Sequence, residues 1–298
     1  MKILNGEKNK CTVRYVQHGI NSETFKKVDV PDTFKKQLFQ GKDFKFVLFW
    51  MNRNIKRKQA SDVIWAYSKF VDELPEEDRK SVVLIMHTEP VDQNGTNLLA
   101  VKDTICPDYH IIFSRQRINQ PELNFIYNLS DVTINIAGNE GFGLTTAESL
   151  MAETPIIVNV TGGLQDQCGF RNSDGNLFTE KDYIEIGSLH EWRKWEETVT
   201  FGKWVIPIWP RVQTLVGSLP TPYIIDDKVD VTEVSHVIRK WYDQSPFQRE
   251  LAGKLGREYM LGDGKLSASD MSNQMGLAID DTLKNFKPRK RHKLYKIK

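Results

Sequence analysis

The chain has 298 residues, of which 40% are hydrophobic and 27% charged, and its formal net charge is +2. This composition excludes collagen-like, low-complexity and mainly disordered chains. The longest apolar runs, such as 46–51 and 82–86, are too short to span a bilayer, and the first residues contain no apolar stretch typical of a secretory leader. Three widely spaced cysteines without a Cys-x-x-Cys pair favour a reducing, cytoplasmic location over a disulfide framework or a zinc site.

The basic residues are concentrated at one end of the chain. Eight of the 41 lie in 284–298, a segment without an acidic residue, which leaves 33 basic and 39 acidic side chains in residues 1–283. The folded body is therefore mildly acidic, which makes a nucleic-acid-binding surface unlikely. Three interpretations of the basic tail stay open: a disordered solubilising end, peripheral contact with an anionic membrane, and contact with another subunit or a nucleic acid.

Apolar strand patterns alternate with helical patterns from residue 44 onward. The expected strands are 44–51, 81–88, 110–116, 132–138 and 155–160, and the expected helices are 62–74, 97–105, 121–130 and 144–153. Strands that are apolar throughout and separated by helices predict a doubly wound α/β domain with a parallel, Rossmann-like sheet. Such sheets bind ligands at the carboxyl ends of their strands.

The flanking segments are less regular. Residues 1–43 are predicted to form an entry strand at 12–16 and a linker, and 161–220 to form a tryptophan-rich insert. The insert contains Trp192, Trp195, Trp204 and Trp209. Burial in a core or against a partner is favoured for these side chains over stacking on sugar rings. A strand at 221–226 and helices near 231–243, 246–260 and 268–284 complete a domain predicted to span 44–283, followed by the tail 284–298.

The loop between the strand at 132–138 and the helix at 144–153 carries the clearest chemical pattern. Gly141 and Gly143 let the backbone approach a ligand, and the first turn of the following helix offers free N–H groups and a positive dipole end to a phosphate. Glu140 and Glu148 bracket the loop, and ionised carboxylates accept strong hydrogen bonds from hydroxyl groups. We therefore expect a ligand with a diphosphate flanked by polyhydroxylated groups, as in a nucleotide-sugar.

A structural interpretation of the same residues stays open. Thr145 and Glu148 fit the Thr-x-x-Glu capping box, in which Glu148 would only cap its own helix, and glycines before a helix are common in turns. The loop is neither a Gly-x-Gly-x-x-Gly dinucleotide fingerprint nor a Walker A loop.

The segment 139–166 resembles the donor-sugar site of retaining glycosyltransferases with the GT-B fold, the group 1 family. The matching residues are Glu140, Gly141, Phe142, Gly143, Leu144, Ala147, Glu148, Pro155, Gly162 and Gly163. The basic pair of that family is matched by Arg53 and Lys58, with Arg57 beside Lys58, whereas Gln59 replaces the usual glycine. The resemblance covers about residues 12–260 and implies the C-terminal, donor-binding half of a GT-B fold, carrying an insert and C-terminal helices.

The resemblance also implies roles for these residues. Glu140 would hold the hydroxyls of the transferred sugar, and Glu148 would hold the ribose. Arg53 and Lys58 would stabilise the diphosphate, with Arg57 beside them, as the bond to the sugar breaks. The loop Gly141–Phe142 would lead into a phosphate cradle formed by the backbone of Gly143, Leu144 and Thr145, and Ser114 would lie near the base. No metal or other cofactor is expected beside a donor such as a UDP- or GDP-sugar.

By this resemblance the chain transfers a sugar to an unknown acceptor with retention of the anomeric configuration. It begins where the second half of such enzymes begins, so the acceptor domain is expected from a subunit in trans, from a longer protein, or from the 161–220 insert. Two alternatives stay open: a nucleotide-sugar-binding module without activity of its own, and a nucleotide-sugar epimerase.

Overall fold

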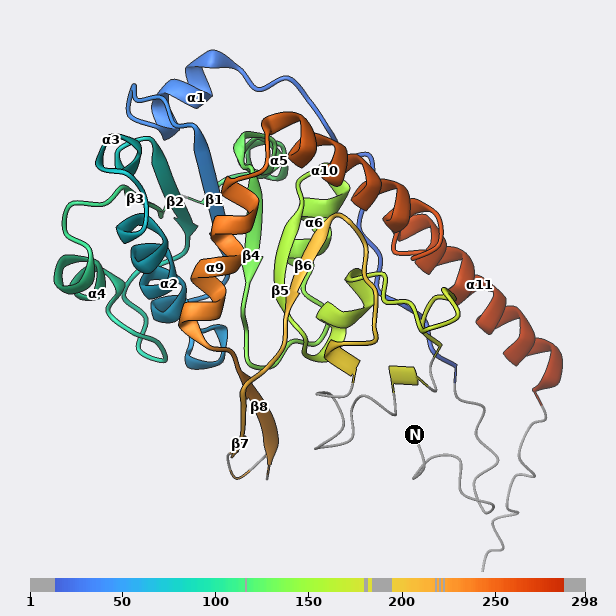
Figure 1. The fold of residues 1–298 in the computed structure, drawn as a ribbon. Coiled ribbons are helices and arrows are strands. Elements are labelled where there is room, and N and C mark those ends of the chain that lie inside the picture. The colour runs from blue at the N-terminus through green and yellow to red at the C-terminus, as the bar shows by residue number, and fades with distance from the viewer. Residues whose placement is uncertain are drawn as a thin grey trace, which may run out of the picture.

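The computed structural model of the protein describes residues 14–115, 117–179, 182–183, 195–217, 219, 221 and 223–286. Its centre is a six-stranded sheet with the order β3-β2-β1-β4-β5-β6, in which all paired strands are parallel (Figure 1). The strands are β1 (Phe46–Met51), β2 (Val82–His87), β3 (Ile111–Ser114), β4 (Val132–Asn135), β5 (Ile156–Asn159) and β6 (Val205–Ile208). The predicted doubly wound α/β sheet is confirmed, and its first five strands are the expected ones.

Helices cover both faces of this sheet, which explains why its strands are apolar throughout. In β1, Phe46, Leu48 and Trp50 point into one hydrophobic core. Val47 and Phe49 point into the other. The helices α2 (Ala60–Asp72), α4 (Leu98–Ile105) and α9 (Val231–Tyr242) cover the first core. The helices α5 (Gln120–Leu129) and α6 (Leu144–Met151) cover the second.

The C-terminal helices follow the predicted boundaries closely. α10 (Pro246–Leu261) packs against α6, and α11 (Ala268–Asn285) runs along the outside of the molecule (Figure 1). None of the described helices is both long and apolar enough to cross a membrane. Most of the basic tail, 287–298, lies outside the described residues, so its three interpretations stay predictions.

Several elements were not expected from the sequence. The linker contains α1 (Asp32–Leu38), and a short helix, α3 (Glu76–Arg79), follows α2. The 161–220 segment supplies β6, the edge strand, and β7 (Val212–Val216), which pairs with β8 (Ile224–Lys228) in a hairpin at the bottom of Figure 1. β6 escaped detection because it is four residues long and contains Pro207, which only an edge strand tolerates.

One predicted strand is wrong in its described part. Residues 14–16 of the entry strand 12–16 form no strand, and 12–13 lie outside the described residues.

Three tryptophans of the 161–220 segment pack inside the protein, which confirms the core interpretation for them. Trp204 stacks on Tyr259 with ring centroids 4.7 Å apart, and Trp209 stacks on Phe170 at 5.8 Å. Trp195 contacts Phe178, whereas Trp192 lies outside the described residues.

Candidate functional site

The loops that follow β1 and β4 meet at the carboxyl edge of the sheet. These strands are neighbours, and the strand order reverses between them, which is the point where doubly wound sheets bind ligands. The N–H of Gly138 donates to the carbonyl of Arg57 at 2.8 Å, and the Arg57 guanidinium donates to the carbonyl of Asn139 at 2.7 Å. The basic segment 53–58 and the glycine loop 138–145 therefore lie side by side, as the resemblance implied.

A buried ion pair joins the two loops. Lys58, in the short 3-10 helix η1 (Lys56–Lys58), donates to the carboxylate of Glu140. Their side chains are only 8% and 11% exposed, and an Arg57 guanidinium nitrogen lies 3.8 Å from the same carboxylate oxygen. Burial lowers the pKa of the Lys58 ammonium group, although the neighbouring Glu140 opposes this shift. Two groups predicted to bind different parts of a donor are thus already in contact.

Arg53 lies at the outer side of the same loop. Its guanidinium bonds both carboxylate oxygens of Asp92, at 2.8 and 3.3 Å, and its side chain is 66% exposed. The hydrogen bond from Arg53 lowers the pKa of the Asp92 carboxyl. The adjacent Asn54 is buried and donates to the carbonyls of Pro90 and Thr96, which holds the loop after β1 against the loop after β2. Neither Asn54 nor Asp92 was predicted from the sequence.

The glycine loop uses its acceptors within the protein but leaves most of its donors unpaired among the described residues. Several of its carbonyls accept hydrogen bonds from neighbouring segments: Gly138 accepts from the N–H of Asp227 at 2.7 Å, Glu140 from that of Gly163 at 3.0 Å, and Phe142 from the Gln167 amide at 2.7 Å. In contrast, the N–H groups of residues 141–146 donate no hydrogen bond to any described residue. Unpaired N–H groups at the start of a helix suit a phosphate.

Three glycines make this loop conformation feasible. Gly143 has a left-handed φ of 88° immediately before α6. A Cβ atom on Gly162 would come within 1.9 Å of the Glu140 carbonyl, and one on Gly163 within 2.3 Å of the Gly141 carbonyl. The helix η2 (Gly162–Gln167) can therefore support the loop only where side chains are missing.

The other loop residues differ in what they can offer a ligand. The Phe142 side chain is partly buried and packs against the core, with its ring 5.0 Å from that of His18. Leu144 is half exposed at the start of α6, and Thr145 is buried.

Glu148 does not cap its own helix. The residue preceding α6 is Gly143, no side chain caps this helix, and the Glu148 carboxylate instead accepts from the Tyr127 hydroxyl of α5 at 2.8 Å. The capping-box interpretation of Thr145 and Glu148 is therefore wrong. Burial raises the pKa of Glu148 to about 7, and the bond from Tyr127 only partly offsets this.

The raised pKa of Glu148 predicts a pH-dependent effect of Glu148→Gln. The folded state holds the Glu148 proton more tightly than the unfolded state, so this group destabilises the fold as pH rises from about 4.5 to 7. A pKa shift of this size corresponds to a loss of roughly 3 kcal/mol in the free energy of unfolding above pH 7. We expect the variant to gain stability over the wild type by up to that amount at about pH 8 and little at about pH 5 in urea unfolding. Glu77→Gln, at an exposed position, controls for the lost charge, and an equal effect at both pH values would contradict the shift.

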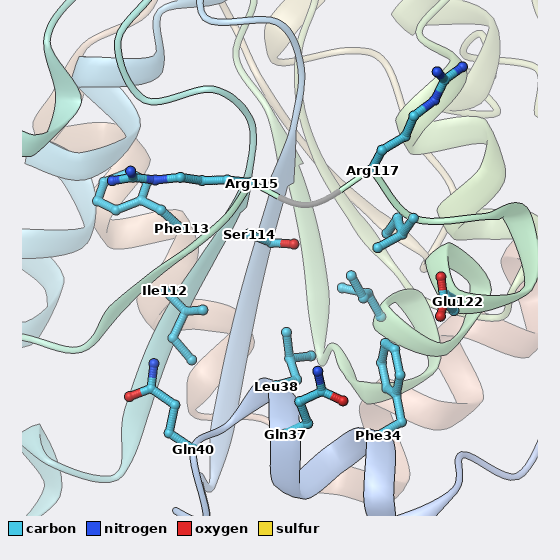
Figure 2. Close-up of a pocket in the computed structure, with 12 residues that line it drawn as sticks. Phe34, Gln37, Leu38, Gln40, Ile112, Phe113, Ser114, Arg115, Arg117 and Glu122 are labelled. Atoms are coloured by element: carbon cyan, nitrogen blue, oxygen red, sulfur yellow. The ribbon is translucent and has the colours of Figure 1, made fainter.

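Ser114 lies apart from the ion pair, at the end of β3 and across β2 from β1. Its hydroxyl contacts Nδ1 of His87 at 2.9 Å, and burial lowers the pKa of His87. Ser114 also lines a cavity of about 540 Å³ between β3, α1 and α5. Figure 2 shows its hydroxyl directed into the cavity, with Leu38 and Phe34 on the opposite side.

Buried polar atoms without a hydrogen-bond partner among the described residues gather at this edge of the sheet. Six of the eight such atoms are Asn52 Nδ2, Asn135 Nδ2, Asn159 Oδ1, Gln165 Oε1, Gln167 Oε1 and Asp226 Oδ1, and the other two are the indole Nε1 atoms of Trp50 and Trp241. Such atoms are rare in folded proteins, and their concentration favours a polar functional site. Within the described part of the chain, no three His, Cys, Asp or Glu residues are arranged to hold a metal ion. Metal independence itself stays a prediction.

Comparison with curated proteins gives matches over part of the chain, to trehalose synthases. No family model matches the sequence. Over 131 residues the chain is 29% identical to a trehalose synthase of Thermococcus litoralis, a match that covers 42% of this chain and 31% of the relative. The chain thus spans about a third of the length of that relative.

Solved structures match over nearly the whole chain. Sucrose-phosphate synthase from Thermosynechococcus elongatus aligns with a TM-score of 0.61 and 16% identity, over 94% of this chain and 55% of that one. Anabaena Alr3699/HepE, in complex with UDP and glucose, aligns with a TM-score of 0.58 and 10% identity, over 90% of this chain and 56% of that one. The C-terminal domain of a group 1 glycosyltransferase, LpcC from Francisella tularensis, aligns with a TM-score of 0.52 and 13% identity, over 82% of this chain and 97% of that domain. The chain therefore has the fold of the C-terminal half of the GT-B glycosyltransferases.

Proposed function

We propose that this chain binds a nucleotide-diphosphate-sugar and transfers its sugar to a hydroxyl acceptor with retention of configuration. The observation that carries the proposal is the buried Lys58–Glu140 pair beside the unpaired N–H groups of residues 141–146. This arrangement offers a cation and N–H donors to a diphosphate and a carboxylate to sugar hydroxyls. UDP and glucose in the structurally similar HepE support a UDP-sugar as the first donor to test.

The proposed roles follow from the positions of the groups. The first turn of α6 holds a phosphate, and Lys58 and Arg53 stabilise the charge that develops on the diphosphate as its bond to the anomeric carbon breaks. Glu140 accepts hydrogen bonds from the sugar, and Glu148 from the ribose. The acceptor hydroxyl attacks from the face that the diphosphate leaves, and its proton passes to the departing phosphate oxygen. Retention follows because both events occur on one face.

The cavity beside Ser114 is the proposed site of the nucleobase. Its lining includes Ser114 and Arg115 at the carboxyl end of β3, on the same edge of the sheet as the ion pair, and extends to α1. Its volume lies within the range of small-molecule pockets, and it combines apolar Leu38, Ile112 and Ile118 with the polar Gln37 and Ser114.

The direct test measures binding and transfer separately. In a thermal-shift screen of UDP-, GDP- and ADP-glucose, a bound donor at about 100 times its dissociation constant should stabilise the protein by about 2.7 kcal/mol. Absence of a shift with every donor would refute the proposed site. Binding without transfer to any acceptor would favour a nucleotide-sugar-binding module, and interconversion of two sugar nucleotides without an acceptor would favour an epimerase.

Arg53→Ala is expected to weaken UDP binding about tenfold, because a charge-assisted contact to phosphate contributes roughly 1.5 kcal/mol. Titration calorimetry with UDP measures this change. Asp92→Asn is the matched control, since it removes the partner of Arg53 and leaves the guanidinium in place. UDP affinity should then be kept or increased, and an unchanged affinity in Arg53→Ala would argue against a diphosphate contact.

A further inference from the structure

The β7–β8 hairpin contacts the candidate site chiefly through Asp227 of β8. This residue is about 90 positions after the glycine loop in sequence, yet its backbone bonds three segments at the carboxyl edge. Its N–H donates to the Gly138 carbonyl at 2.7 Å, and its carbonyl accepts from the amides of Asn159 at 3.0 Å and Gln59 at 3.3 Å. Asp227 thereby connects the segments that follow β1, β4 and β5.

The carboxylate of Asp227 is also fully used. One oxygen accepts from the Thr161 hydroxyl at 2.7 Å, and the other from the Gln213 amide at 2.7 Å. Gln213 lies opposite Asp227 on β7, whereas Thr161 follows β5. The side chain therefore fastens the hairpin to the end of the sheet, in addition to the backbone contacts.

The hairpin approaches the glycine loop closely. A Cβ atom on Gly138 would lie 2.1 Å from a carboxylate oxygen of Asp226, the residue before Asp227. The side-chain amide of Asn139 donates to the Ile225 carbonyl at 3.3 Å. Two consecutive residues before Glu140 are thus held by three consecutive residues of β8.

Gln59 shows that this contact has a conformational cost. It precedes α2 with a left-handed φ of 51°, a conformation that costs a non-glycine residue on the order of 1 kcal/mol. Its side chain donates to the Asp227 carbonyl, a bond that glycine cannot make. The departure from the usual glycine at this position therefore adds one more link between the β1 loop and the hairpin.

We propose that Asp227 is a positioning residue that fixes the Gly138–Glu140 segment, and hence the Glu140 carboxylate, relative to Lys58. The proposal rests on the proposed function for its catalytic consequence but not for its structural one. Loss of the Asp227 side chain frees Thr161 and Gln213 and loosens the hairpin, so Glu140 samples positions away from Lys58. A misplacement of about 1 Å in a reacting group can lower a rate by about 100-fold.

The test compares Asp227→Ala with Asp227→Asn by hydrogen–deuterium exchange of the full chain. In Asp227→Ala, exchange of the Gly138 amide, which donates to the Arg57 carbonyl, and of the residue-227 amide, which donates to the Gly138 carbonyl, should accelerate at least about tenfold, in line with the loss of roughly 1.4 kcal/mol of local stability. Asp227→Asn should stay near the wild type, because its oxygen still accepts from Thr161 and its NH₂ can donate to a rotated Gln213 amide. Leu215→Ala, on the same face of the hairpin and 73% exposed, is the control without effect.

The kinetic arm separates positioning from folding. In Asp227→Ala, kcat should fall about 10- to 100-fold with the donor KM within about threefold, and Asp227→Asn should recover most of kcat. Thr161→Val removes a single hydrogen bond to Asp227 and should lower kcat by a smaller factor. This variant replaces Asp227→Ala in the test if Asp227→Ala does not fold. Unchanged exchange of the amides of Gly138 and residue 227, or acceleration spread evenly over the domain, would overturn the inference. If the wild type transfers no sugar, the proposed function fails and the exchange data alone decide on Asp227.

Discussion

Glu140→Gln is expected to lower the rate of sugar transfer at least about 100-fold, because the variant loses the charge that complements the sugar hydroxyls and the oxocarbenium-like transition state. Binding of UDP should change less than about threefold, since in the proposed site the diphosphate contacts Lys58, Arg53 and the backbone of α6 instead. Steady-state kinetics and calorimetry with UDP measure the two quantities. Glutamine is preferred to alanine, because it keeps an oxygen facing the buried Lys58.

The matched control for Glu140→Gln is Glu89→Gln. Glu89 is an exposed carboxylate on the loop after β2, at the same edge of the sheet. This control should transfer sugar at the wild-type rate. Transfer by Glu140→Gln at a rate within about threefold of the wild type would remove Glu140 from the catalytic machinery.

The second large effect is expected on stability, from Lys58→Met. The substitution leaves the Glu140 carboxylate buried with only Arg57 nearby, at 3.8 Å. Removing one partner of a buried ion pair typically costs about 3–5 kcal/mol, so we expect a loss of about 3 kcal/mol in the free energy of unfolding. Urea unfolding of the single variants and of Lys58→Met/Glu140→Leu completes a double-mutant cycle.

The double variant distinguishes an ion pair from two independent burial effects. It should recover most of the lost stability, because no unpaired charge remains in the interior. Strictly additive losses in the cycle would show that Lys58 and Glu140 do not interact energetically, and the site would then lack its preassembled charge pair.

The core of the fold could be predicted because strands buried on both faces are apolar throughout and helices buried on one face repeat apolar residues at helical spacing. β1, for example, is an unbroken apolar run, and α2 repeats apolar residues at helical spacing. The edge strand β6 left no such trace, since only one of its long sides is paired and Pro207 interrupts its pattern. α1 was missed because none of its residues is buried, so it shows no apolar periodicity.

The candidate site was predicted only as far as its motifs reach. Glu140, Lys58 and Arg53 belong to recognisable segments, and the parallel sheet places those segments together. The residues that contact them do not belong to such motifs. Asp92 contacts Arg53 from the loop after β2, Asp227 contacts the glycine loop from β8, and Glu148 accepts a hydrogen bond from Tyr127 on another helix. Contacts between side chains remote in sequence depend on the packing of whole elements, which local periodicity does not specify.

The one-sided hydrogen bonding of the glycine loop implies that the two ends of a bound donor would respond differently to acidity. Backbone N–H groups do not titrate, so those of residues 141–146 remain donors at every pH at which the protein is folded. Glu148, with its pKa raised to about 7 by burial, changes charge near neutrality. The phosphates of a nucleotide-diphosphate-sugar are both esterified and do not titrate near neutrality, so we expect Glu148 to contribute a dependence of donor affinity on pH in this range that Glu148→Gln abolishes.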